Sequence, residues 1–127
     1  MESAVQKIAA ICFLIIGLSH IFQARAWAEF FIIVRSKGEA GSFLTALLHL
    51  PIGALIVSFH NVWQGIPAVL TIVGWGYVLK SLIYFTFPRY GVKMLSRVTI
   101  ERSWEFVIPG ILMVGYGGLL AYSLLKN

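Results

Sequence analysis

The chain has 127 residues, of which 59% are hydrophobic and 12% are charged, and its formal net charge at pH 7 is +5. This composition excludes an ordinary soluble domain, in which about 25% of residues are charged. The single cysteine, Cys12, excludes an intrachain disulfide and a metal site built from cysteines. In so apolar a chain, we interpret the positive charge as a signal of membrane orientation and of contact with anionic lipid, not of nucleic-acid binding.

Four apolar segments, each long enough to cross a bilayer, fill most of the sequence. A helix needs roughly 20 apolar residues to span a hydrocarbon core about 30 Å thick. The first segment also has the basic start and small-residue end of a secretory signal, but we interpret it as a retained spanning helix. We therefore predict an all-α fold in which residues 1–127 form a single domain, an integral membrane bundle of four transmembrane helices. The predicted spans lie at about residues 5–23, 42–60, 66–87 and 104–125.

The segment that links the first two spans has the pattern of an amphipathic helix. Its apolar residues recur at i, i+3, i+4 and i+7, opposite Arg25, Glu29 and Ser36. Those apolar residues are Trp27, Phe30, Phe31 and Val34. Such a helix is suited to the headgroup region of a membrane. The alternative is that these residues extend the spanning helices into water.

Spans two and three are joined by a short turn and are expected to form an antiparallel hairpin. Asn61 and Gly65 end one helix, and Pro67 suits the first turn of the next. Trp63, within the turn, is typical of a residue anchored at the membrane interface.

After the third span, a second linking segment repeats the amphipathic pattern more weakly. It opens with Pro88 and continues to about residue 103. Its apolar residues Met94, Leu95 and Val98 are opposed by a charged and polar face. That face consists of Lys93, Ser96, Arg97 and Glu101. We expect this segment also to lie at the membrane surface.

The two halves of the chain match at an offset of about 57–58 residues. Gly17 and Gly74 lie in the first span of each half, and Pro51 and Pro109 lie in the second. The offset favours two repeats of helix, surface segment and helix, related by an axis along the membrane normal. Chance agreement between so few residues is the alternative.

Basic residues are distributed unequally between the two sides of the predicted bundle. The side with the termini and the turn carries only Lys7 and Lys126, whereas the linking segments carry seven basic residues. These seven are Arg25, Arg35, Lys37, Arg89, Lys93, Arg97 and Arg102. Because short cytoplasmic loops collect lysine and arginine, we predict that the linking segments face the cytoplasm and that both termini lie outside a bacterial inner membrane. The seven residues are then a basic surface toward anionic lipids of the cytoplasmic leaflet.

Polar side chains within the spans gather in the half nearest the predicted cytoplasmic side. Counting residues from each boundary puts His49 and Lys80 about 10 Å deep, and His20 and Glu105 close to the boundary. One polar pocket open to the cytoplasm explains this distribution, and we predict that it binds a ligand or conducts protons. Its predicted residues are His20, Thr45, His49, Tyr77, Lys80, Tyr84 and Glu105.

Lys80 is the most informative member of this set. A lysine within a span costs about 2.5–3.5 kcal/mol on insertion scales, so it usually faces the bundle and has a partner. Glu105, Glu101 and Glu29 are the candidate partners, and the alternative is that Lys80 extends to the headgroups. His49 is a candidate for proton relay or ligand contact, because imidazole titrates near neutral pH, or else it is a hydrogen-bonded packing residue.

The sequence predicts no cofactor, no metal site and no catalytic residue. His20 and His49 lie on different predicted helices at unequal depths, so we do not expect a haem or a zinc ion between them. His60 lies at the outer boundary, where an interfacial histidine needs no special role. We also find no nucleophile–base pair, phosphate-binding loop or pair of carboxylates in the sequence.

Short motifs around the predicted hairpin are similar to sequences of one group of membrane proteins. They are Leu55-Ile56-Val57, His60-Asn61-Val62-Trp63, Thr71-Ile72-Val73-Gly74-Trp75 and Lys80. In these motifs, which cover a minor part of the chain, the sequence resembles small four-span bacterial inner-membrane proteins that have no known activity. The resemblance implies the four-helix fold and a bacterial source, and it implies no reaction or substrate.

Three functions are compatible with these patterns. The first is binding or transport of a small ligand, an ion or a lipid headgroup at the polar pocket around Lys80, His49 and Glu105. The second is an accessory or assembly subunit of a membrane complex. The third is a membrane enzyme that acts on a lipid or quinone, with the histidines or Glu105 in acid–base roles. So thin a bundle also favours a homo-oligomer or partner membrane subunits.

Overall fold

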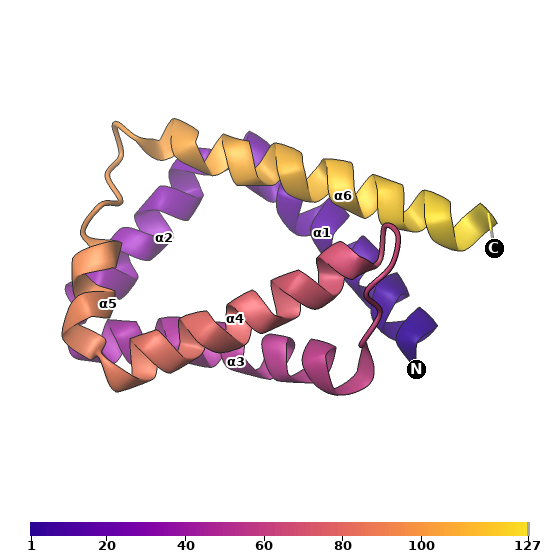
Figure 1. Cartoon of the computed structure of the whole chain (residues 1–127). Helices are drawn as coiled ribbons and strands as arrows, with labels where there is room; N and C mark the ends of the chain where they lie inside the picture. The colour runs from indigo at the N-terminus through magenta and orange to yellow at the C-terminus, as the bar shows by residue number, and fades with distance from the viewer. Residues whose placement is uncertain (127) are drawn as a thin grey trace.

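Six α-helices and one short 3₁₀-helix make up residues 1–126, the part of the chain that this computed structural model describes (Figure 1). In chain order they are α1 (Glu2–Phe22), α2 (Ala24–Ser36), α3 (Glu39–Phe59), α4 (Ala68–Thr86), α5 (Pro88–Leu95), the 3₁₀-helix η1 (Ser103–Phe106) and α6 (Val107–Lys126). Residues 1–126 contain no β-strand, which confirms the predicted all-α fold.

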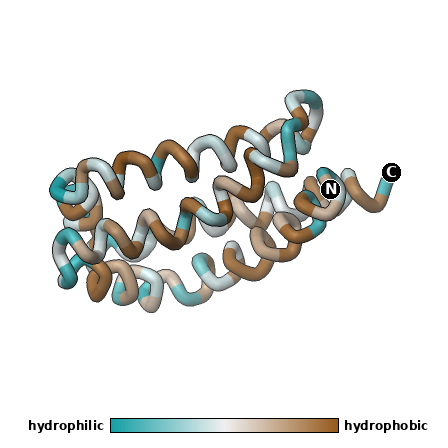
Figure 2. The backbone as a smooth tube through the Cα atoms, turned by 90° about the horizontal axis from the view of Figure 1, so that it is seen from below, coloured by the Kyte–Doolittle hydropathy of each residue, from teal (hydrophilic) through white to brown (hydrophobic). Residues whose placement is uncertain are grey.

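Four of the helical segments are long and apolar enough to cross a membrane. They are α1, α3, α4 and the continuous segment formed by η1 and α6, and they agree with the predicted spans to within a few residues at each end. Figure 2 shows hydrophobic residues along the length of these helices. Large apolar side chains lie on their outer faces, and Leu112, for example, is 67% exposed. Because hydrocarbon solvates such side chains and water does not, this surface indicates an integral membrane protein.

The four spans form two antiparallel pairs, α1 with α6 and α3 with α4 (Figure 1). The second pair is the predicted hairpin. Each pair crosses most closely at two glycines. A Cβ on Gly110 would lie 2.8 Å from the carbonyl oxygen of Gly17, and a Cβ on Gly53 would lie 3.0 Å from that of Gly74. Only glycine fits at these points, and such close approach of backbones is how helices associate in lipid.

The contacts within the α1–α6 pair match those within the α3–α4 pair when residues 57 positions apart in the sequence are compared. Gly17 and Gly74 are 57 positions apart, and so are Gly53 and Gly110. At each crossing, the glycine on α6 or α3 lies against the residues three and four positions after the glycine on its partner helix, α1 or α4. These residues are His20 and Ile21 for Gly110, and Tyr77 and Val78 for Gly53. A two-fold internal repeat, with α1–α2–α3 matching α4–α5–α6, produces this correspondence.

The two pairs are held together mainly at their ends. Both termini and the 60–67 segment lie at one end, which we call the hairpin end, and α2, α5 and the 96–102 loop form the opposite basic end (Figure 1). At the hairpin end an apolar cluster buries Ala10, Ile56, Leu70 and Leu120. At the basic end a second cluster buries Val34, Ala46, Tyr84 and Leu95. Helix α2 contacts both η1 and α3, so it joins one pair to the other.

The linking segments are helical as expected, but the second helix is shorter than its sequence pattern. α2 covers residues 24–36, which include the expected amphipathic pattern from Trp27 to Val34. α5 ends at Leu95, so the predicted amphipathic pattern through Glu101 does not form one helix. The Ser96 hydroxyl donates to the carbonyl of Lys93, and three β-branched residues follow at 98–100. Both features disfavour continuation of the helix.

Candidate functional site

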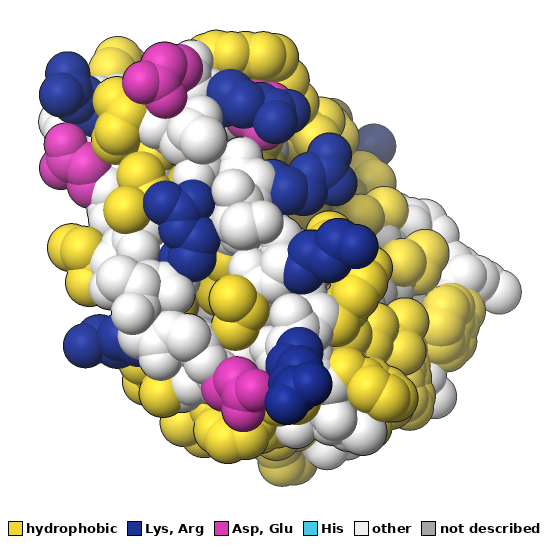
Figure 3. Space-filling model, turned by 90° about the vertical axis from the view of Figure 1, so that its left-hand side faces the viewer, with side chains coloured by type: hydrophobic (Ala, Val, Ile, Leu, Met, Phe, Trp, Pro, Cys, Tyr) yellow, Lys and Arg dark blue, Asp and Glu magenta, His cyan; other side chains and the backbone are white. Residues whose placement is uncertain are grey.

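Basic side chains gather over the end formed by α2, α5 and the adjoining loops, as Figure 3 shows. All seven residues predicted for the basic surface lie on these elements, at the end opposite the two termini. Three of them form ion pairs, which are Arg25–Glu29, Arg89–Glu39 and Arg102–Glu105. The unequal distribution of charge between the two ends of the bundle is therefore a property of the folded chain.

Arg35 differs from the other basic residues because it has a structural role. It is half-buried, and its guanidinium donates to the carbonyl oxygens of Ser96, at 3.3 Å, and Val98, at 2.6 Å. These bonds hold the 96–102 loop against α2. Both bonds use Nη1 of Arg35, and contact of this side chain with lipid stays a prediction.

Five of the seven residues predicted for the polar pocket lie together on α3 and α4. The His49 ring meets the Tyr77 ring edge-on, with centroids 5.0 Å apart, and the Lys80 Nζ lies 5.6 Å from the centroid of the Tyr84 ring. Thr45 is buried and donates its hydroxyl to a backbone carbonyl of its own helix. We call His49, Tyr77, Lys80 and Tyr84 the α3–α4 polar cluster.

This cluster holds polar groups that have no protein partner. The Nδ1 of His49 lies 2.7 Å from the carbonyl oxygen of Thr45, and a carbonyl only accepts, so Nδ1 carries the proton. Its Nε2 is then an available acceptor. Among residues 1–126, neither this Nε2 nor the Tyr77 hydroxyl nor the Lys80 ammonium forms a hydrogen bond or ion pair. The cluster therefore holds two donor groups and one acceptor that have no partner among residues 1–126.

The other two predicted residues, His20 and Glu105, belong to the α1–α6 pair. The His20 ring stacks on Trp27 with centroids 4.1 Å apart. The Glu105 carboxylate lies 2.6 Å from Nη2 of Arg102, which is three residues away on the same segment. None of the three candidate partners, Glu105, Glu101 and Glu29, forms an ion pair with Lys80 among residues 1–126. Glu105 pairs with Arg102 instead, and Lys80 extends along Tyr84 on the other helix pair. The single pocket expected from sequence is thus divided between two pairs.

The internal repeat relates these two groups of residues. His20 and Tyr77 occupy matching positions at the 57-residue offset, and so do Phe106 and His49. Their rings form corresponding contacts, at 5.9 Å for His20–Phe106 and 5.0 Å for Tyr77–His49. The repeat therefore preserves an aromatic contact next to each glycine crossing, and only the α3–α4 copy adds a lysine.

A buried polar network at the hairpin end escaped sequence reasoning. His60 is 0% exposed and bonds through both ring nitrogens, Nδ1 to Thr71 Oγ1 at 2.9 Å and Nε2 to Gln6 Nε2 at 3.1 Å. The Thr71 hydroxyl donates to the Val62 carbonyl at 2.7 Å, so it accepts from Nδ1–H. Nε2 is then the acceptor for the Gln6 amide. This chain of bonds ties α1 to the α3–α4 pair.

Burial also sets the charge state of His60. Removal of the ring from water lowers its pKa below the ordinary value, and the nearby charge of Glu2 opposes this shift only in part. The ring is therefore neutral at pH 7, as the hydrogen-bond pattern requires. One sequence pattern could have indicated this network: a polar residue lies near the same end of each of three spans. These residues are Gln6, His60 and Thr71.

Tyr116 forms a second link between the pairs at the hairpin end. Its hydroxyl accepts from the backbone N–H of Leu70 and donates to the carbonyl of Ile66, both at 2.9 Å. These bonds tie α6 to the first turn of α4. The two links close this end of the bundle, whereas α2 and η1 connect the pairs at the other.

An apolar crevice of about 340 Å³ lies between α1 and α3. This volume is within the range of about 300–1,000 Å³ that is usual for ligand pockets. Exposed side chains such as Ile8, Ile52 and Leu55 line it, so it opens sideways between the helices. The crevice extends from Met1 at the hairpin end to the middle of the spans, where Tyr77 of the polar cluster lines it.

Residues 1–126 contain no group of three or more His, Cys, Asp or Glu side chains arranged to hold a metal ion. His20 and His49 lie on different helix pairs, and each donates Nδ1–H to a backbone carbonyl four residues earlier.

Comparisons with protein families, with curated proteins and with solved structures found no match to this chain.

Proposed function

We propose that the protein binds a lipid-like molecule that has one hydrocarbon chain and a small polar head. The chain lies in the α1–α3 crevice, and the head lies at the α3–α4 polar cluster. The observation that carries this proposal is that the apolar crevice ends at Tyr77, a member of that cluster.

The composition of the crevice supports a hydrocarbon chain as its occupant. Its walls are almost entirely apolar, and α1 and α3 are both helices that are apolar enough to span a membrane. A crevice that opens sideways in such helices is in contact with lipid, so the molecules that reach it are hydrocarbons and amphiphiles. Its volume suits a single chain better than a two-chain phospholipid.

The unpaired groups of the cluster support a polar head. Lys80 supplies a cation, Tyr77 supplies a hydroxyl, and the Nε2 of His49 is an acceptor. A cation within a spanning helix usually has a partner, because an isolated charge there is costly. A carboxylate or another small anionic head would provide that partner, as no carboxylate among residues 1–126 does so.

The proposal includes an orientation in a bacterial inner membrane. The basic end faces the cytoplasm, because short basic loops remain on that side, and both termini face outward. The polar cluster then lies in the cytoplasmic half of the bilayer and the crevice extends outward from it. A bound ligand would place its head at this cluster, and its chain would extend along the crevice toward the outer face of the membrane.

A pair of adjacent substitutions on α1 tests the crevice. Cys12 lines the crevice, and its neighbour Ile11 faces outward; both are exposed, so both tolerate a larger side chain. We expect Cys12→Phe to fill the crevice and remove most of the lipid that remains bound through purification in mild detergent, as measured by mass spectrometry. Ile11→Phe should retain the parent amount. Equal retention by both variants would refute the crevice as the binding site.

Substitution of Lys80 tests the head. A hydrogen bond to a charged group contributes about 1.5–3 kcal/mol, which corresponds to about tenfold or more in affinity. We therefore expect Lys80→Met to weaken retention of lipids with an anionic head by about tenfold. Lys80→Arg keeps the charge and should retain them. If Lys80→Met binds as the parent does, the lysine has no contact with the head.

A further inference from the structure

A second hollow, separate from the α1–α3 crevice, lies where the 96–102 loop meets the start of the last span. It has a volume of about 210 Å³. Its lining combines three ionisable and three apolar residues, which are Arg97, Val98, Arg102, Glu105, Phe106 and Pro109. We call it the arginine pocket. It has no role in the function proposed above.

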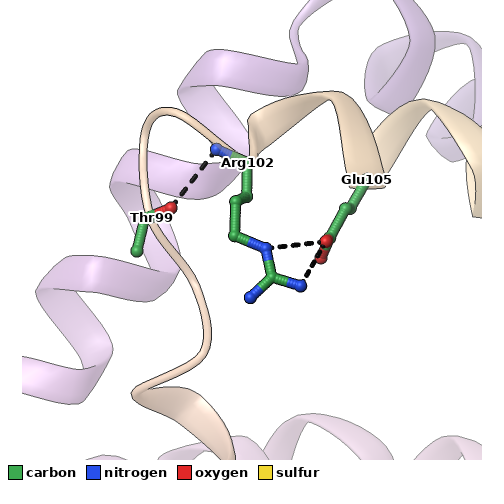
Figure 4. A network of polar contacts seen from close by, with 3 residues as sticks. All are labelled: Thr99, Arg102 and Glu105. Carbon is green, nitrogen blue, oxygen red and sulfur yellow. Dashed lines mark hydrogen bonds and ion pairs between the residues drawn. The ribbon is translucent and has the colours of Figure 1, made fainter.

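Arg102 lines this pocket and contacts two nearby residues, Thr99 and Glu105 (Figure 4). Its Nε and Nη2 lie 2.8 Å and 2.6 Å from the same oxygen, Oε1 of Glu105, and its backbone N–H donates to Thr99 Oγ1 at 3.2 Å. Nη1 has no protein partner among residues 1–126, so the guanidinium keeps donors available. Glu105 therefore orients Arg102 and leaves one side of it unpaired.

Arg97 supplies a second guanidinium, on a loop that is bonded to α2. The bonds from Arg35 to the carbonyl oxygens on either side of Arg97, those of Ser96 and Val98, anchor the loop to α2. Arg97 itself is exposed and has no ion pair in the described part of the chain. Two guanidinium groups and one carboxylate leave the pocket with one excess positive charge.

We infer that the arginine pocket binds the phosphate of an anionic phospholipid from the surrounding leaflet. The planar donors of two arginines match phosphate oxygens and favour them over a single-point cation contact. The apolar wall of Phe106 and Pro109 continues onto α6, where Ile111 and Leu112 are exposed and would lie along an acyl chain. A soluble phosphate would not use this apolar continuation.

The position of the pocket along the chain agrees with a headgroup site. It lies at the start of the segment Ser103–Lys126, which is apolar enough to span a membrane. Trp104, beside it, is exposed, and tryptophan is enriched at the membrane–water interface. The site therefore joins the basic end to the apolar flank of the bundle, as a phospholipid joins its phosphate to its chains.

Three matched arginine substitutions test this inference. Arg102→Gln and Arg97→Gln alter the pocket, and Arg25→Gln removes another exposed arginine from the basic end, one that is also paired with a glutamate. Binding of phosphatidylglycerol and of phosphatidylcholine to the purified full-length protein would be compared by native mass spectrometry. We expect the parent to prefer phosphatidylglycerol, and each pocket variant to bind it about tenfold more weakly, the effect of one charged hydrogen bond. Arg25→Gln, which lies outside the pocket, should weaken this binding much less than either pocket variant does.

Three outcomes would overturn the inference. Equal losses in all three variants would mean that total surface charge, not the pocket, attracts the lipid. A parent protein that does not prefer phosphatidylglycerol would have no anionic lipid site. Displacement of phosphatidylglycerol by added inorganic phosphate would assign the pocket to a soluble anion instead. Retention of phosphatidylglycerol in the presence of inorganic phosphate supports the lipid assignment.

Discussion

Replacement of Gly110 by alanine tests the packing on which the whole fold depends. An added Cβ would lie 2.8 Å from the carbonyl oxygen of Gly17 and 2.8 Å from the Cβ of His20. Ordinary contacts of this kind begin at about 3.4 Å, and the oxygen belongs to the backbone, so it cannot rotate away. Helices α1 and α6 would have to separate by several tenths of an ångström along their closest contact.

The expected cost follows from two opposing effects. Overpacking at a tight contact typically costs about 1–3 kcal/mol. Alanine in place of glycine inside a helix returns roughly 0.5–1 kcal/mol. We therefore expect Gly110→Ala to lower the free energy of unfolding by about 1 kcal/mol, and by about 2.5 kcal/mol at most. Gly115, five residues later on the same helix, has no atom within 4 Å of an added Cβ, so Gly115→Ala should be neutral or stabilising.

Unfolding in mixed micelles of a mild detergent and sodium dodecyl sulfate, followed by circular dichroism, would measure the difference between these variants. The repeat gives an internal check, because Gly53→Ala at the corresponding crossing of α3 and α4 should cost about as much as Gly110→Ala. If Gly110→Ala is as stable as the parent, the two helices do not cross at that residue. If Gly115→Ala is the more damaging variant, the wrong face of α6 has been assigned to the contact.

Further predictions concern the two ends of the bundle. Because burial lowers the pKa of His60 in the folded protein, the unfolded chain binds more protons, so stability should be full above pH of about 6.5 and should fall as the pH drops below it. His60→Gln should show a weaker fall between pH 8 and pH 5 in thermal unfolding. Tyr116→Phe removes two hydrogen bonds and should lower the free energy of unfolding by about 1–3 kcal/mol, whereas Tyr122→Phe, at an exposed tyrosine, should not. Arg35→Gln should release the 96–102 loop, measured as faster tryptic cleavage within it in detergent solution; an unchanged rate would mean that the loop does not depend on this arginine. A reporter that is active only outside the cytoplasm should be active when fused after Lys126, and an inactive fusion of a well-expressed protein would reverse the proposed orientation.

The fold was predictable because the length of each apolar run decides whether a helix can cross a bilayer. All four spans, the amphipathic helix of residues 24–36 and the hairpin follow from run length, periodicity and turn residues. The offset of Gly17 and Gly74 also pointed to the repeat, although only the contacts of Gly53 and Gly110 make it visible. These features are local or depend on the spacing of residues along one helix, so they can be predicted from the sequence.

The site was predictable only in part, because depth along a helix does not say which helices are neighbours. His49 and Tyr77 lie on one hairpin and do come together, and Lys80 lies over Tyr84 on the same hairpin. Glu105 has a suitable depth but lies on the other pair, beside Arg102. His60 was passed over because a boundary position does not reveal that three helices meet there.

The crevice itself had no signal in the sequence. Its walls consist of the same types of apolar residue that face lipid elsewhere, so residue type does not mark the crevice. Cys12 and Ile11 are adjacent and similarly apolar, yet only Cys12 lines the crevice. The angles at which helices cross, set by the glycine contacts, decide where such a space forms.

Photo-crosslinking with a fatty acid that carries a diazirine on its chain is the most direct test of the proposed function. In membranes that contain the intact protein, we expect peptide mapping to find the label on crevice residues such as Cys12, Ile52 and Leu55. Excess unlabelled fatty acid should prevent this labelling. Labelling spread evenly over outward-facing residues such as Ile72 and Leu79, and unaffected by the competitor, would contradict the proposed function.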